Sequence, residues 1–159
     1  MGLATELGLI LKKHERMLVT AESCTGGMLA EVITSVPGSG TWFERGLITY
    51  SNIAKQELLG VKHATLERFG AVSKEVAKEM ADGALLNSNA QVSIAITGIA
   101  GPSGGTEGKP VGMVHFACAG IDCQTKTFFQ QFLGDRAAIR QQAVKFALEQ
   151  LIEFVKQIK

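Results

Sequence analysis

Short apolar runs of strand length alternate with segments of helical periodicity along this chain, and no other sequence feature constrains its fold as strongly. The runs 17–21, 41–50 and 91–97 are rich in aliphatic, aromatic and β-branched residues, which favour strands. Two later runs, 111–119 and 126–133, flank a short turn and are typical of an antiparallel hairpin. Predicted helices cover 2–16, 25–35, 52–59, 64–69, a segment capped by Ser73, and 136–157, capped by Asp135.

This order of elements predicts a three-layer α/β/α sandwich with a mixed, mostly parallel sheet of about five strands. Residues 1–159 are expected to form one domain, since a chain of 159 residues buries about two-thirds of its unfolded surface. Hydrophobic residues make up 46% of the chain and charged residues 19%, which is typical of a globular protein and not of a disordered one.

The net charge of +1 offers no electrostatic basis for binding nucleic acid or an anionic membrane surface. No apolar run approaches the roughly 20 residues that span a bilayer, and residues 1–16 lack the apolar middle of a signal peptide, so a cytoplasmic protein is expected. Three cysteines without a Cys-x-x-Cys pair and three scattered histidines predict neither a disulfide framework nor a metal site.

The segment Thr20-Ala21-Glu22-Ser23-Cys24-Thr25-Gly26-Gly27 joins the first predicted strand to a helix. A helix start presents backbone N–H groups that suit a phosphate or a developing oxyanion. The segment also presents the hydroxyl of Ser23 and the thiol of Cys24. A helix cap explains the same residues, because Ser and Thr are favoured in that position anyway. Taken alone, the segment leaves both interpretations open.

Common nucleotide and hydrolase motifs fail in this chain. Gly108-Lys109 lacks the upstream glycine and the following Ser or Thr of a P-loop, and Gly98 lacks the second glycine of the dinucleotide fingerprint. Ser103 stands in Gly101-Pro102-Ser103-Gly104-Gly105, which spells a nucleophile elbow, but no helical pattern follows it. The segment 98–110 is therefore interpreted as a glycine-rich loop.

Three predicted strands end in residues that can do chemistry: Ser23, Tyr50 and Thr97, with Lys55 one turn into the helix after Tyr50. If these strands are parallel neighbours, their ends and the glycine-rich loop meet at one sheet edge, where α/β proteins bind ligands. Lysine can activate a serine when burial lowers its pKa. The structural alternatives are an exposed helix lysine and a half-buried strand aromatic.

Arg136 and Arg140 lie one turn apart at the start of the last helix, where an arginine fork could bind phosphate or carboxylate. A solvated helix face explains the same pair. Cys24 is an alternative nucleophile to Ser23, but no histidine lies near it in sequence, and a small buried hydrophobe is an ordinary structural role for cysteine.

Several segments together resemble one family. They are the octapeptide 20–27, Trp42-Phe43-Glu44-Arg45-Gly46, Thr49-Tyr50-Ser51-Asn52 with Lys55, Gly70-Ala71-Val72-Ser73, Thr97-Gly98-Ile99-Ala100-Gly101-Pro102, Lys109-Pro110-Val111-Gly112, and Gly134-Asp135-Arg136 with Arg140. Over nearly the whole chain they are similar to the CinA C-terminal domain family, the nicotinamide mononucleotide (NMN) deamidases. The N-terminal domain of the longer CinA proteins is absent, so the sequence resembles the stand-alone form. One departure is Gly108, where the family leads us to expect a second acidic residue.

The resemblance implies hydrolysis of the NMN carboxamide to nicotinate mononucleotide and ammonia, without cofactor or metal, by a homodimeric α/β/α protein. It implies Ser23 as the nucleophile with Lys55 and Tyr50 as partners. Substrate contacts are expected from the helix start at Thr25, Gly26 and Gly27, from Thr97 with Gly98 and Gly101, and from Arg136 in preference to Arg140. The expected oxyanion donors are the N–H groups of Gly26 and Gly27. The alternative is a non-catalytic nucleotide-binding regulatory module of the same fold.

Overall fold

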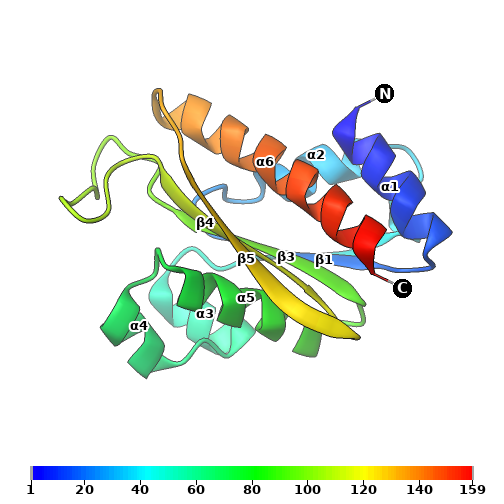
Figure 1. The fold of residues 1–159 in the computed structure, drawn as a ribbon, viewed down its shortest axis with the longest axis horizontal. Coiled ribbons are helices and arrows are strands. Elements are labelled where there is room, and N and C mark those ends of the chain that lie inside the picture. Colours follow the sequence, from blue (N-terminus) through cyan, green and yellow to red (C-terminus); the bar gives the residue numbers. More distant parts are fainter. Residues whose placement is uncertain (1, 159) are drawn as a thin grey trace.

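A computed structural model describes residues 2–158, which form three layers with a five-stranded sheet between two helical layers (Figure 1). The strands are β1 (Leu18–Glu22), β2 (Phe43–Ile48), β3 (Val92–Gly98), β4 (Met113–Gly120) and β5 (Cys123–Gln131). The helices are α1 (Leu3–Lys13), α2 (Met28–Thr34), α3 (Asn52–Leu59), α4 (His63–Phe69), α5 (Lys74–Leu86) and α6 (Arg136–Gln157), with one 3₁₀ turn (Ser39–Thr41). The predicted α/β sandwich is confirmed.

The sheet has the strand order β2-β1-β3-β4-β5. β1 pairs in parallel with β2 on one side and β3 on the other, and β4 pairs antiparallel with both β3 and β5. Four strands therefore point one way and β4 alone points the other, as the predicted late hairpin requires. Because β1, β2 and β3 are parallel neighbours, their carboxyl ends lie together at one edge of the sheet.

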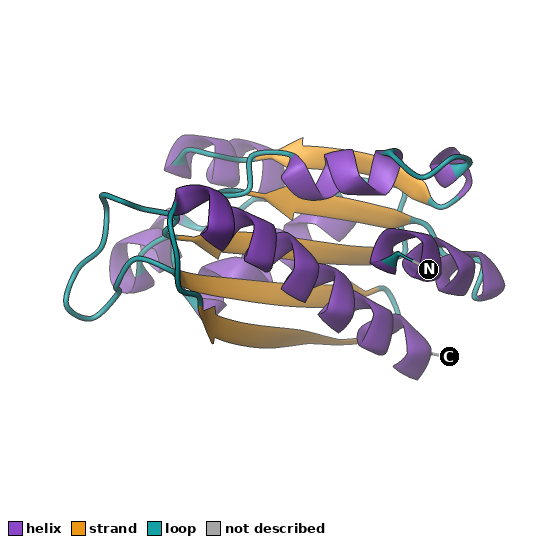
Figure 2. Ribbon diagram, turned by 90° about the horizontal axis from the view of Figure 1, so that it is seen from above, coloured by secondary structure: helices purple, strands orange, loops and turns teal. Residues whose placement is uncertain are grey.

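Each face of the sheet is covered by a different set of helices. α1, α2 and α6 cover one face, and α3, α4 and α5 lie against the other (Figure 1); seen from above, α6 runs obliquely across the strands (Figure 2). A hydrophobic core lies on each side of the sheet, and successive residues of a strand point into opposite cores. Ile94 and Ile96 of β3 pack in the core beneath α1, α2 and α6, and Ala95 packs in the core beneath α5. β1 is buried along its whole length, so its C-terminal end is rigidly placed.

Side-chain caps set the helix starts that matter for the site. Ser51, Ser73 and Asp135 accept hydrogen bonds from backbone N–H groups three residues later, at 3.0, 3.2 and 2.8 Å. These three caps were predicted and are confirmed, and the predicted bounds of α3 and α6 match the structure.

Other helix bounds differ from the prediction because of backbone conformation. The helix predicted over 25–35 begins at Met28, since Gly26 and Gly27 have φ angles of 56° and 101° and form a turn instead. The helix predicted over 2–16 ends at Lys13, because Glu15 has a φ of 54° and turns the chain into β1. The strand predicted over 41–50 is shorter, from Phe43 to Ile48, and follows the 3₁₀ turn.

Gly83 of α5 allows close contact with the end of α3, the helix that carries Lys55. A Cβ at this position would lie 1.8 Å from the Leu59 carbonyl oxygen, so either α3 or α5 must move. Gly83→Ala is expected to lower the free energy of unfolding by about 2 kcal/mol or more in urea denaturation. Gly40→Ala is the matched control, because no atom lies within 4 Å of the added methyl group. Equal stability of the two variants would contradict this account of the α3–α5 contact.

Within residues 2–158, no helix combines the length and the apolar character needed to span a bilayer.

Candidate active site

A cleft of about 310 Å³ lies at the carboxyl edge of β1, β2 and β3, where the sequence predicts the site. Its walls come from four parts of the chain: the turn after β1, the start of α3, the segment before α5 and the glycine-rich loop. The start of α6 closes one side. The lining residues include predicted and unpredicted ones: Ser23, Cys24, Tyr50, Asn52, Lys55, Ala71, Val72, Thr97, Gly98, Ile99, Ala100, Gly101, Ser103, Gly104 and Arg136.

The central contact in the cleft joins Ser23 to Lys55. Lys55 Nζ lies 3.0 Å from Ser23 Oγ, although the two residues are 32 positions apart in the chain. Nζ also lies 2.9 Å from the carbonyl oxygen of Thr49 and 3.2 Å from that of Tyr50. Lys55 is 1% exposed, so the structural alternative of an exposed helix lysine is wrong.

The surroundings of Lys55 shift its pKa in the direction of the neutral amine. Burial lowers the pKa of Lys55, because removing the ammonium from water disfavours its charged form. None of the described residues forms a carboxylate ion pair with Lys55 to offset this cost. As an ammonium, Nζ donates to Ser23 Oγ and to the carbonyls of Thr49 and Tyr50; as a neutral amine it keeps two N–H bonds for the carbonyls and a lone pair that can accept the Ser23 hydroxyl proton. The geometry therefore suits a base directed at Ser23.

Tyr50 and Arg136 meet at the mouth of the cleft. Tyr50 is 61% exposed, and its hydroxyl accepts a hydrogen bond of 3.1 Å from Nη2 of Arg136. Nη1 of Arg136 donates to the Gly101 carbonyl at 2.8 Å, so this side chain bridges α6, the glycine-rich loop and Tyr50. Within residues 2–158, the Tyr50 hydroxyl forms no hydrogen bond with Ser23 or the Lys55 amine, and this arrangement favours orientation of a ligand over a proton relay.

Thr97, Gly98 and Gly101 also line the cleft, as predicted. The Thr97 hydroxyl donates to the Ala71 carbonyl at 2.9 Å, which ties the end of β3 to the segment before α5. Gly98 and Gly101 are required by space: a Cβ at Gly98 would lie 2.7 Å from Val114, and one at Gly101 would lie 2.4 Å from Val111. Gly101 also has a φ of 76°.

The remaining predicted substrate contacts lie outside the lining of the cleft. Thr25, Gly26, Gly27 and Arg140 are absent from the lining, and Thr25 is fully buried. The expected role of Gly26 as an oxyanion donor is corrected, because its N–H already donates to the Ser23 carbonyl at 3.0 Å. Arg140 donates to the carbonyls of Cys24 and Thr25 at 3.1 and 3.0 Å, so Arg136 is the arginine that faces the cleft.

Glu22 is the site residue that residue-by-residue reasoning missed. Its carboxylate, 1% exposed, accepts from the Thr25 hydroxyl at 2.6 Å and from the N–H groups of Leu29 and Ala30 at 2.9 and 3.0 Å. This carboxylate occupies the N-terminus of α2, where an anionic ligand was expected to bind. The sequence did contain a sign of this role: Glu22 is a lone charged residue at the end of an uncharged strand, directly before Ser23.

Cys24 lies beside Ser23 but is poorly suited to be the nucleophile. Burial raises the pKa of the Cys24 thiol to about 11, so almost none of it is thiolate near neutral pH. Cys24 is also 7% exposed and packs in the core beneath α6. The packing role expected as one alternative for this residue therefore fits the structure.

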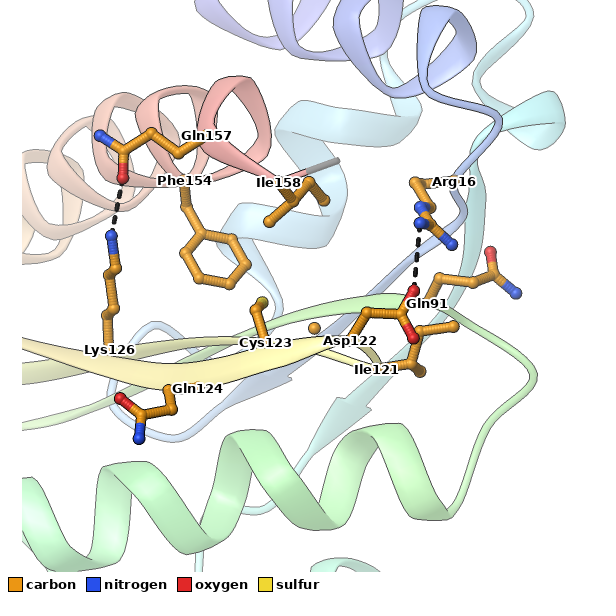
Figure 3. A pocket seen from close by; sticks show the side chains of 11 residues that line it. Arg16, Gln91, Ile121, Asp122, Cys123, Gln124, Lys126, Phe154, Gln157 and Ile158 are labelled. Carbon is orange, nitrogen blue, oxygen red and sulfur yellow. Dashed lines mark hydrogen bonds and ion pairs between the residues drawn. The ribbon is translucent and has the colours of Figure 1, made fainter.

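A second cavity, of about 320 Å³, lies at the opposite edge of the sheet, by the β4–β5 turn and the end of α6 (Figure 3). Arg16 and Asp122 form an ion pair of 3.3 Å across it, and Lys126 donates to Gln157 at 2.7 Å. It contains none of the predicted site residues. Among residues 2–158, no group of three His, Cys, Asp or Glu side chains is placed to hold a metal ion.

Comparison with known proteins decides the family. The CinA C-terminal domain model matches residues 1–155. The chain belongs to the CinA C-terminal domain family. Among curated relatives of this CinA domain, the nicotinamide-nucleotide amidohydrolase PncC of Enterobacter agglomerans is 51% identical, over 97% of this chain and 94% of that protein. The PncC of Escherichia coli strain K12 is 50% identical, over 95% and 92%.

Solved structures of the family share this fold. The competence/damage-inducible protein CihA of Agrobacterium tumefaciens superposes on this CinA domain with a TM-score of 0.94 and 42% identity, over 98% of this chain and 94% of that one. The five-stranded mixed sheet with its two helical layers is therefore the fold of the family, and the cleft lies at the carboxyl ends of its central strands.

Proposed function

We propose that this CinA domain is a nicotinamide-nucleotide amidohydrolase that converts NMN to nicotinate mononucleotide and ammonia. The observation that carries the proposal is the buried contact of 3.0 Å between Lys55 Nζ and Ser23 Oγ, in which the lysine has no carboxylate partner among the described residues. Such a pair is suited to nucleophilic attack on an amide carbon. The names of the PncC relatives, which cover nearly the whole chain, supply the substrate class.

In the proposed first step, the Ser23 proton moves to Lys55 Nζ as Oγ attacks the carboxamide carbon. The resulting ammonium of Lys55 then gives this proton to the departing nitrogen, the C–N bond breaks, and ammonia leaves an acyl-enzyme. Water attacks the acyl group while Lys55 again takes a proton, and that proton returns to Ser23 Oγ as the acid product leaves; the acid then gives its remaining proton to solvent and becomes the carboxylate. The net reaction consumes one water and needs no other reactant.

The oxyanion of each tetrahedral intermediate needs backbone donors near Ser23. The N–H of Cys24 follows the nucleophile directly, and among residues 2–158 its hydrogen bond goes only to the thiol of Cys24 itself, with no backbone acceptor. We therefore assign it in place of Gly26. Preorganised donors of this kind contribute about 100- to 1,000-fold to the rate.

Arg136 and Tyr50 are proposed to hold the nucleotide outside the reacting centre. Two hydrogen bonds, to Gly101 and Tyr50, use two of the five N–H donors of Arg136, and the others are available to a phosphate. Both side chains are exposed at the mouth, which supports a binding mode with the charged end of the substrate near solvent and the carboxamide at Ser23. Free nicotinamide, which lacks the ribose phosphate, is then a poor substrate.

The direct test is ammonia release from NMN by the purified protein, followed by identification of the pyridine product. Release of one ammonia for each nicotinate mononucleotide supports the proposal. Binding of NMN without ammonia release over hours, measured by calorimetry, would instead establish the non-catalytic regulatory module. Release of inorganic phosphate would point to a phosphohydrolase.

Arg136→Ala is expected to raise the KM for NMN by about 10- to 100-fold and to change kcat much less, because an exposed arginine binds the phosphate in ground state and transition state alike. Turnover of free nicotinamide should not change. Arg68→Ala removes an exposed arginine of α4 that lies outside the cleft and serves as the control. An unchanged KM in Arg136→Ala would exclude a phosphate contact by this residue.

A further inference from the structure

Two charged side chains hold the turn of Ser23 from different directions. Glu22, at the end of β1, presents its carboxylate to hydrogen-bond donors at the start of α2. Arg140, in the second turn of α6, presents its guanidinium to backbone carbonyls of the turn. Neither side chain lines the cleft or bonds to the Ser23 hydroxyl. Neither side chain touches the reacting atoms, and the contacts that link both to Ser23 run through the backbone of the turn and the start of α2.

The carboxylate of Glu22 replaces a helix cap. α2 has Gly27 as its N-cap residue, with no side-chain cap, so its first N–H groups need another acceptor. Both oxygens of Glu22 serve them, and the Thr25 hydroxyl adds a third bond. A buried carboxylate is costly unless it is fully hydrogen-bonded, and here three donors within 3.0 Å offset that cost. The bonds connect the residue before Ser23 to the helix after it.

Arg140 fixes the peptide planes on the other side of Ser23. Its Nε and Nη2 bind the carbonyls of Cys24 and Thr25, so both oxygens point toward α6. In a trans peptide the N–H points opposite to the C=O, so the N–H of Thr25 points away from Arg140. The next N–H, that of Gly26, closes the turn on the Ser23 carbonyl at 3.0 Å.

We propose that Glu22 and Arg140 are positioning residues of the proposed amidase, which together hold Ser23 Oγ at hydrogen-bond distance from Lys55 Nζ. A charge of each sign is needed because the turn presents donors on one side and acceptors on the other. The contacts of Glu22 and Arg140 are observed in the structure, whereas the rate assay below also rests on the proposed function. A displacement of about 1 Å at a nucleophile can cost about 100-fold in rate, which sets the scale expected.

The first experiment measures kcat and KM for NMN in Glu22→Gln and Arg140→Gln. In Glu22→Gln the amide nitrogen cannot accept a hydrogen bond from Ala30, so one bond becomes a donor–donor conflict. Both variants are expected to lose at least about tenfold in kcat with KM changed less than twofold, measured on protein shown to be folded by circular dichroism. Glu31→Gln removes the same charge from an exposed position of α2 and should keep the wild-type kcat.

The second experiment separates this role from simple loosening of the fold and needs no turnover. Cys24 lies in the turn, and its thiol is the probe: the charge of Glu22 raises its pKa and the charge of Arg140 lowers it. In a Cys123→Ser background, which removes the exposed thiol, alkylation of Cys24 by iodoacetamide at pH 9 is followed by peptide mass. We expect faster alkylation in Glu22→Gln and slower alkylation in Arg140→Gln, because the thiolate is the reactive form.

Loosening of the turn would speed alkylation in both variants, since it exposes the thiol, and this result would overturn the proposal. Wild-type kcat in both folded variants would overturn it as well. If Glu22→Gln does not fold, Arg140→Gln alone decides: reduced kcat with alkylation no faster than in the wild type supports the positioning role, and wild-type kcat or faster alkylation overturns it. If the wild-type protein releases no ammonia from NMN, the proposed function fails, while the changes in alkylation still test whether Glu22 and Arg140 act on the turn of Ser23 without loosening it.

Discussion

Ser23→Ala is expected to abolish ammonia release from NMN, with a loss in kcat of at least about 1,000-fold, while the fold stays intact. The hydroxyl is the only group of Ser23 that enters the reaction, and its backbone bonds to Ile96 and Gly26 do not depend on it. The side chain is small and lies at the cleft, so its loss leaves no large cavity. The measurement is steady-state ammonia release together with thermal unfolding.

Two further variants make the Ser23 experiment specific. Ser35→Ala removes an exposed hydroxyl at the end of α2 and should keep full activity. Cys24→Ala tests the rival nucleophile: a loss as large as that in Ser23→Ala would transfer the assignment to the thiol. Near-normal turnover in Ser23→Ala would falsify the serine mechanism outright.

Lys55→Met is expected to lower kcat by about 100- to 10,000-fold, the range that a general base contributes. Methionine has similar length and no amine, so the site keeps its shape but loses the base. Stability is affected by two opposed changes: the cost of burying an amine disappears, and the carbonyls of Thr49 and Tyr50 lose a donor. The variant should therefore fold. Lys12→Met, at an exposed position of α1, is the control.

The pH profile gives Lys55 a second, independent test. The base must be neutral, so kcat/KM should rise with pH as Lys55 loses its proton. Because burial lowers the pKa of Lys55, this rise should lie below the pH range in which an ordinary lysine titrates. Lys55→Met should retain its residual rate without that rise. A wild-type profile that rises only in the ordinary lysine range would contradict the role of Lys55 as the base.

Local sequence pattern determined most of the secondary structure of this protein. The periodicity of apolar residues and the caps at Ser51, Ser73 and Asp135 depend on neighbours within about one helical turn, and these elements match the prediction. The bounds that differ, at the ends of α1 and α2, depend on left-handed backbone at Glu15, Gly26 and Gly27. A glycine permits such a conformation but does not require it, so sequence alone could not place these turns.

The sequence also brought Ser23, Tyr50, Lys55 and Thr97 to one sheet edge, through the rule that ligands bind at the carboxyl ends of parallel strands. It could not decide what each side chain faces. The contacts that decide this join residues between 5 and 116 positions apart. They are the bonds of buried Lys55, the bond between Tyr50 and Arg136, and the bonds of Arg140 to the turn. Such contacts depend on how α3 and α6 pack on the sheet.

Glu22 shows the difference most clearly. By its sequence it is a charged residue next to a candidate nucleophile, and the helix start after it was expected to hold an anionic group of the substrate. Only the tertiary structure places its own carboxylate there, because burial beneath α2 leaves the helix N–H groups as its partners. Sequence determined which groups are available at this edge, and packing decided which of them face the substrate and which hold the turn in place.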